Sequence, residues 1–88
     1  MPKPSDYIKK GWCQGTNAKD SLGWFCVPSD PDAIGWCLSG AILAAYANDP
    51  VKREKVCNQL PIVALVTWND EPGRLQAEVV ELLLSIGE

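Results

Sequence analysis

Three Gly-Trp pairs follow one another at a constant interval of 12 residues in the first half of the chain. They are Gly11-Trp12, Gly23-Trp24 and Gly35-Trp36, and a cysteine stands within two residues of each tryptophan. Tryptophan is the largest side chain, and a small domain needs such residues to bury enough surface. A glycine beside it indicates a turn or a close approach of two backbone segments. The repeat therefore predicts that much of the core is built in this half of the chain.

Length, composition and charge limit the class of protein. Eighty-eight residues, 47% of them apolar, fit one core and one globular domain spanning residues 1–88. The 11 acidic and 8 basic residues leave a net charge of −3. The longest basic runs, Lys9-Lys10 and Lys52-Arg53, contain only two residues each, which argues against a surface for direct nucleic-acid binding.

The start of the chain and its longest apolar stretch bear on localisation. Residues 1–6 contain no apolar segment of the kind found in a signal peptide. The longest apolar stretch, residues 41–47, is much shorter than the roughly 20 residues that cross a bilayer. These features predict a cytoplasmic protein without membrane contact.

The cysteines and the absence of histidine limit the chemistry. Cys13, Cys26, Cys37 and Cys57 contain no Cys-x-x-Cys spacing, and the chain has no histidine. A zinc site is therefore disfavoured, and in a reducing compartment we expect buried free thiols. Catalytic arrangements that pair Ser or Cys with His are excluded, and no glycine-rich phosphate loop is present. The sequence predicts a non-enzymatic protein without metal or cofactor.

A short helix and a loop-rich segment are expected first. Ser5 is a suitable N-cap for a helix that ends at Lys10, with Gly11 as the C-terminal glycine. The following segment is rich in Gly, Asn, Asp, Ser and Pro, which favours a loop. A small hairpin is one option there, with Cys13-Gln14 and residues 25–27 as strands around a turn at residues 17–20.

The best-specified element is a central helix. Asp30-Pro31 supplies an N-cap and a proline in the first turn, and apolar and small residues then recur at helical spacing. This pattern places Cys37 inside the helix and Asn48 at its C-terminal cap. Asp49-Pro50 repeats the start signal for another helix that ends near Gln59.

The last third of the chain contains one ambiguous segment and one clear helix. Residues 62–68 are rich in β-branched side chains and fit either a buried strand or a helix. Residues 74–86 carry one apolar stripe typical of a helix that packs on the core. The fold class predicted is a mainly α single domain of three to four helices around a Trp/Ala-rich central helix, with the small β-hairpin as an option.

Several short motifs, taken in order, resemble a known family. They are Gly11-Trp12-Cys13-Gln14-Gly15, Trp36-Cys37-Leu38-Ser39-Gly40-Ala41, Trp68-Asn69-Asp70 and Gln76-Ala77-Glu78-Val79. Together they resemble an uncharacterised family of small bacterial and phage proteins, a domain of unknown function, over residues 11–84. That family tends to have Thr at the position of Leu75, where it forms a capping box with Glu78. Because leucine cannot cap, we expect the last helix to begin earlier, at Asn69 or Asp70, or to fray. The resemblance implies a fold and no activity.

Six residues are candidates for a binding site. In a functional interpretation, Asn69 and Asp70 project from the edge of the core and bind a ligand or a partner. In a structural interpretation, Asp70 caps the last helix and Asn69 makes local turn hydrogen bonds, which is the commoner role of such residues. The same alternatives hold for Gln14. Trp12 and Trp24 are the tryptophans most expected to be exposed, and exposed tryptophan is enriched in binding hot spots. Asp20 completes the candidate set.

Two functions from different classes fit these features. The first is a non-catalytic protein-binding module that sterically covers a host or bacterial protein, for example as a phage-encoded inhibitor of a CRISPR-type or other defence protein. The second is a small-molecule or nucleotide-binding protein, with or without enzymatic activity, whose pocket is walled by tryptophan and anchored by Asp70. A homodimer through the alanine-rich helix is a further option.

Overall fold

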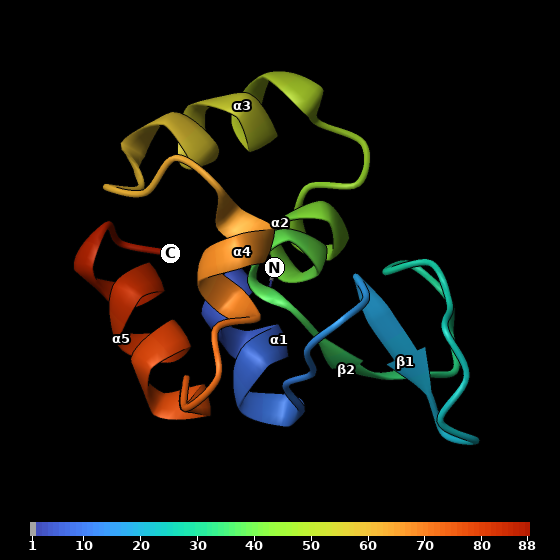
Figure 1. Cartoon of the computed structure of the whole chain (residues 1–88). Helices are drawn as coiled ribbons and strands as arrows, with labels where there is room; N and C mark the ends of the chain where they lie inside the picture. Colours follow the sequence, from blue (N-terminus) through green and yellow to red (C-terminus); the bar gives the residue numbers. More distant parts are fainter. Residues whose placement is uncertain (1) are drawn as a thin grey trace.

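The computed structural model describes residues 2–88 and arranges them as five helices and a two-stranded antiparallel sheet (Figure 1). The elements in chain order are α1 (Pro4–Lys10), β1 (Ala18–Asp20), β2 (Ala33–Trp36), α2 (Leu38–Ala45), α3 (Pro50–Gln59), α4 (Leu65–Asn69) and α5 (Gln76–Ser85). The mainly α class with a small β element is confirmed, although the helices number five in this part of the chain instead of three to four.

Helix α2 is the centre of the fold. It contacts α1, α3, α4 and β2, whereas α5 packs mainly on α1. Figure 1 shows the strands on the opposite side of α1 and α2 from α5. No helix within residues 2–88 has the length and apolar character needed to cross a membrane.

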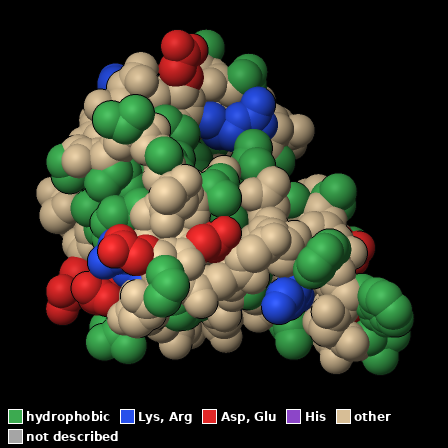
Figure 2. Space-filling view, in the orientation of Figure 1, with side chains coloured by type: hydrophobic (Ala, Val, Ile, Leu, Met, Phe, Trp, Pro, Cys, Tyr) green, Lys and Arg blue, Asp and Glu red, His purple; other side chains and the backbone are tan. Residues whose placement is uncertain are grey.

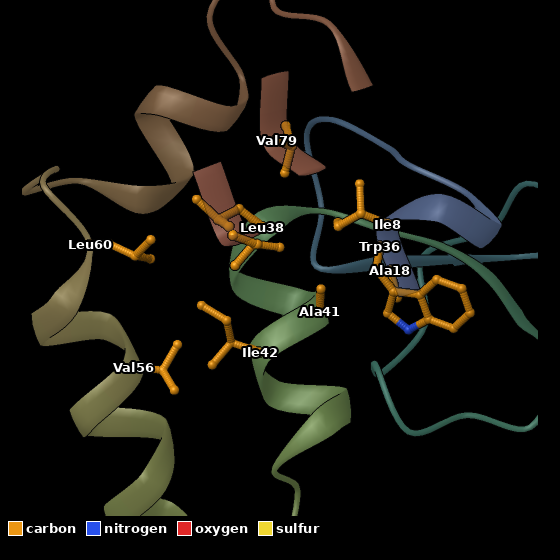
Figure 3. Packing of buried hydrophobic residues seen from close by; sticks show 10 residues of the cluster. Ile8, Ala18, Trp36, Leu38, Ala41, Ile42, Val56, Leu60 and Val79 are labelled. Carbon is orange, nitrogen blue, oxygen red and sulfur yellow. The ribbon is translucent and has the colours of Figure 1, made fainter. Parts of the chain in front are cut away.

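The core lies between α2 and the elements around it, as Figure 3 shows. Its buried members are Ile8, Ala18, Trp36, Leu38, Ala41, Ile42, Val56, Leu60, Val79 and Leu83. Of the three tryptophans in the repeat, only Trp36 belongs to this group, and its ring meets that of Tyr7 edge-on with centroids 5.1 Å apart. Trp12 is half-buried and Trp24 is exposed. The regular spacing therefore does not mark three equivalent core positions.

The predicted start of the central helix is wrong. Asp30 lies in a turn, where its carboxylate accepts a hydrogen bond from the Asp32 N–H at 2.8 Å, and the chain then forms β2. Helix α2 begins at Leu38, and Cys37 is its N-cap, with the sulfur accepting from the Gly40 N–H at 3.2 Å. Pairing with β1 overrides the local helix signal in residues 33–36, because the strand gains backbone hydrogen bonds there.

The end of α2 also differs from the prediction. The helix ends at Ala45 with Tyr46 as its C-cap, so Asn48 lies outside it. Near its start, Gly40 packs directly on the backbone of the preceding loop. A Cβ at this position would lie 1.8 Å from the carbonyl oxygen of Asn17, so only glycine fits without movement.

The hairpin has different strands from those expected. β1 pairs with β2 in the register Ala18↔Trp36, with a bulge between Lys19 and Asp20. Residues 17–20, predicted as a turn, thus lie largely within a strand, and Cys13-Gln14 does not pair with residues 25–27. The isolated bridge between Lys19 and Phe25 shows that the latter segment does lie beside β1.

The remaining helices follow local signals more closely. Asp49 caps α3 as predicted, its carboxylate accepting from the Lys52 N–H at 3.0 Å, and α3 ends at Gln59. Helix α1 begins at Pro4, so Ser5 is its second residue and not its cap. Gly11 follows α1 in an extended conformation instead of the left-handed one, and a Cβ there would lie 2.0 Å from the Ile34 carbonyl oxygen.

The C-terminal third resolves the ambiguity left by the sequence. The second half of residues 62–68 forms α4, which extends to Asn69. The last helix, α5, begins at Gln76, with Leu75 at the N-cap position, and not at Asn69 or Asp70. The Glu78 carboxylate accepts from the Leu75 N–H at 2.8 Å. The acidic half of a capping box is therefore sufficient to start this helix.

Candidate functional site

Asn69 is the centre of the best-defined polar cluster. Its side chain is fully buried, and its oxygen accepts hydrogen bonds from the Trp12 indole N–H at 2.7 Å and the Leu38 N–H at 3.0 Å. Its amide nitrogen donates to the Cys13 carbonyl at 3.1 Å and to the Asp70 carboxylate at 2.9 Å. All hydrogen-bonding positions of the side chain are engaged, so Asn69 joins α4 to α2 and to residues 12–13 and is not free to bind a ligand.

Gln14 and Asp70 complete this junction. The Gln14 amide nitrogen donates to the carbonyl of Asn69 at 2.9 Å and to that of Glu71 at 3.3 Å. The Asp70 carboxylate accepts from the Gly15 N–H at 3.1 Å. Asp70 lies at the C-terminal end of α4 and does not cap α5, which corrects the structural interpretation above. Four of the six candidates (Trp12, Gln14, Asn69 and Asp70) therefore meet, but they fasten the loop after α1 to α4.

Asp20 belongs to a different part of the molecule, together with Trp24. Its carboxylate accepts from the N–H groups of Leu22 at 3.0 Å and Trp24 at 2.9 Å, which closes the loop after β1. Gly23 has φ +82°, a left-handed conformation that suits glycine. The loop is thus held by hydrogen bonds from its N–H groups to the Asp20 carboxylate, and Trp24 is presented from this closed turn.

The segment from Asp20 to Ile34, which we call the apolar lobe, carries a group of exposed large apolar side chains. They are Leu22, Trp24, Phe25, Val27 and Ile34, and each is between 56% and 79% exposed. Figure 2 shows apolar side chains gathered at the lower right, at the end of the molecule that Figure 1 assigns to the strands. Ordered soluble domains seldom leave so many large apolar groups in water without a functional reason.

Sequence reasoning found only part of this lobe. The sequence indicates Asp20 and Trp24, but the helix that it predicts from Asp30-Pro31 would include Ile34, and it offers residues 25–27 only as one option for a hairpin strand. The available signal was the stretch from Ser21 to Ser29, which contains no charged residue. An uncharged apolar stretch in a loop is a candidate interaction surface, whereas the same stretch in a helix or strand is usually core.

Besides the apolar lobe, the molecule has a concave region around α4. Its volume is about 650 Å³, and its lining comes from Ile62, Val63, Ala64, Val66, Thr67, Trp68, Asp70, Glu71 and Pro72. All these residues belong to one stretch of chain, so no second element closes the region over a ligand. The Arg74 guanidinium lies over the Trp68 ring, 3.8 Å from its centroid, and forms ion pairs with Glu71 and Glu78.

The thiols are in environments that suppress their reactivity. All four cysteines are free. Burial, with the nearby Cys37 sulfur as a second cause, raises the pKa of Cys13 to about 11. Burial also raises the pKa of Cys37, against partial lowering by backbone N–H groups, and the pKa of Cys57, against partial lowering by the charge of Arg53. Among residues 2–88, no three His, Cys, Asp or Glu side chains are grouped so that they could hold a metal ion.

The fold and these sites define a small α-plus-β domain with a polar junction around Asn69 and an exposed apolar lobe. The chain belongs to the family of unknown function DUF6197, whose model matches residues 5–86. The resemblance to an uncharacterised family is thereby confirmed. A search of curated proteins and a search of solved structures found no significant match to the chain.

Proposed function

We propose that this protein is a non-catalytic binding module that docks onto another protein through the apolar lobe. The observation that carries the proposal is the exposure of Trp24 and Phe25, 69% and 74%, on an ordered loop. Aromatic side chains bury about 150–250 Å² each, so these two alone offer roughly 300 Å² of apolar surface. That area already reaches the size at which a surface patch is often functional.

The ordered backbone of the lobe supports the same proposal. The Ser21 hydroxyl donates to the Asp32 carboxylate at 2.8 Å, and the Trp36 indole N–H donates to the Pro28 carbonyl at 3.0 Å. These bonds join the two arms of the lobe to each other and to the core. A preformed surface loses less conformational freedom on binding, which favours affinity.

The mechanism that follows is steric. A module of this size covers a working surface of its partner, and we propose that the partner is a host or bacterial protein in the cytoplasm. The four free thiols fit a reducing compartment. The resemblance to a family with phage members supports a more specific role, inhibition of a host defence protein such as a CRISPR effector.

A second candidate function rests on the concave region around α4. Trp68 and Asp70 line it together, which matches the combination of aromatic wall and acidic anchor expected for a small-ligand site. The Asp70 carboxylate already accepts two hydrogen bonds, however, and one continuous segment provides the whole lining. The apolar lobe is therefore the better-supported site.

The test is a quantitative pull-down from a bacterial lysate with the wild type, Trp24→Ala and Val63→Ala. Val63 is the matched control, because its side chain is fully exposed and lines the region around α4 instead of the lobe. We expect a stoichiometric partner that Val63→Ala retains and Trp24→Ala loses, with circular dichroism showing that both variants are folded. Equal recovery of the partner by both variants would contradict a role for the lobe.

A further inference from the structure

The backbone of the apolar lobe contains an open strand edge. The Trp24 carbonyl accepts from the Asp20 N–H at 2.9 Å, and the Cys26 N–H donates to the Ala18 carbonyl at 3.1 Å. Residues 24–26 therefore lie as a short strand beside β1, bridged at Lys19 and Phe25. Since backbone groups of successive strand residues point in opposite directions, the N–H and C=O of Phe25 face away from β1. Neither group has a hydrogen-bond partner within residues 2–88.

The edge is short, but residues 24–26 themselves contain no lysine, no proline and no charged side chain that would block it. Natural edges are commonly blocked by lysine, proline or a covering element. Here the edge residue is Phe25, 74% exposed, with the exposed side chains of Trp24 and Val27 nearby in the chain. An unpaired, apolar edge is a template for the addition of another strand.

The charged side chains that belong to the apolar lobe itself are all negative. The lobe contains Asp20, Asp30 and Asp32, and no Lys or Arg occurs from residue 20 to residue 51. None of these three carboxylates forms an ion pair with a base in the described chain. Two bases lie beside the lobe: Lys19, on β1 opposite Phe25, and Arg53, which lines a small hollow together with Pro28 and Ser29.

From these observations we propose that the partner docks as an extended strand along residues 24–26, with apolar side chains against the lobe and Lys or Arg at its flanks. The proposal rests on the function proposed above and specifies the chemistry of the partner. A second copy of this chain fits poorly as the partner, because contact between two lobes would bring their carboxylates close together and the like charges would repel. Phosphate-rich surfaces, such as nucleic acids and anionic membranes, are disfavoured by the same charges.

The test uses two synthetic peptides of alternating Val and Thr, one with a pair of Lys at each end and the other with pairs of Glu. Each is titrated into the ¹⁵N-labelled protein, and amide shifts and hydrogen exchange are followed residue by residue. We expect the Lys-flanked peptide to shift the amides of residues 24–27 and to protect the Phe25 N–H from exchange. The Glu-flanked peptide should produce neither effect at the same concentration.

Two sets of variants separate the backbone contribution from the charge contribution. Phe25→Pro and Phe25→Ala both remove the aromatic ring, but only proline removes the edge N–H, and proline is tolerated at sheet edges. We expect Phe25→Pro to bind the Lys-flanked peptide roughly fivefold to tenfold more weakly than Phe25→Ala. The double variant Asp30→Asn/Asp32→Asn can retain the local hydrogen bonds while losing two charges. It should bind roughly fivefold more weakly than the wild type, and its binding should depend less on salt.

Several results would overturn the proposal. They are equal binding of both peptides, binding of neither, shifts confined to other residues, or self-association of the protein through residues 24–27. These failures are distinguishable from failure of the proposed function. If the pull-down partner still depends on Trp24 while the Lys-flanked peptide does not bind, the lobe is a docking surface for a partner of different chemistry.

Discussion

Replacement of Asn69 by alanine is expected to destabilise the fold far more than its position at the end of a short helix would indicate. The side chain is fully buried and makes four hydrogen bonds. Alanine leaves the buried Leu38 N–H without a partner, at a cost of about 2 kcal/mol, since an unsatisfied buried donor costs about 1–3 kcal/mol. The Trp12 indole N–H and the Cys13 carbonyl are only partly buried and regain some contact with water, so each adds roughly 0.5–1 kcal/mol.

The expected total is about 3–4 kcal/mol, a large share of the roughly 5–15 kcal/mol by which domains are stable. Urea denaturation followed by tryptophan fluorescence measures this difference directly. Asn58→Ala is the matched control, because Asn58 is exposed on α3 and should change stability by less than about 0.5 kcal/mol. A cost for Asn69→Ala below about 1 kcal/mol would refute the reasoning, since the network would then be replaceable by water.

Three further predictions concern other parts of the molecule. Gly40→Ala places a Cβ 1.8 Å from the Asn17 carbonyl oxygen and should cost about 2 kcal/mol or more in thermal or urea unfolding, whereas Gly35→Ala, with its nearest contact at 3.7 Å, should cost clearly less. Burial and an adjacent carboxylate raise the pKa of Tyr46 to about 12, so the stability that this shift provides is fully present below pH about 10 and is lost as the pH rises towards 12. Tyr46→Phe should lack that loss in the same pH series. With its pKa at about 11, the Cys13 thiol should react with iodoacetamide roughly tenfold more slowly at neutral pH than an exposed cysteine with the ordinary pKa of 9.0, because the smaller thiolate fraction is partly offset by the higher nucleophilicity of its thiolate; peptide mass spectrometry measures this.

The parts of the fold that the sequence predicted are those controlled by local signals. Asp49-Pro50 starts α3 because a capping carboxylate and a proline act within one turn. The same type of signal at Asp30-Pro31 failed, because pairing of residues 33–36 with β1 supplies more hydrogen bonds than a local helix start. That pairing joins segments about 15 residues apart, and no local pattern encodes it.

In the candidate site, too, the sequence indicates residues from local patterns but does not indicate their long-range partners. The sequence indicates Asn69 and Asp70 as candidate polar residues, but the partners of Asn69, such as the Trp12 indole and the Leu38 N–H, come from distant segments. Of the two interpretations left open for Asn69, the structure shows a structural role, but one built on long-range hydrogen bonds instead of a local turn. Of the two tryptophans expected to be exposed, Trp24 is exposed and Trp12 is half-buried, and the hairpin considered for residues 25–27 carried no prediction of an open edge. Exposure depends on which elements remain uncovered after packing, and composition does not determine that.

The most direct test of the central claim is to measure how much partner protein the Trp24→Ala variant recovers from a bacterial lysate, relative to Val63→Ala. Both positions are exposed, but only Trp24 lies on the apolar lobe. The proposed function predicts a stoichiometric partner with Val63→Ala and nearly complete loss with Trp24→Ala. Recovery of the same partner in the same amount by both folded variants would show that the lobe is not the docking surface.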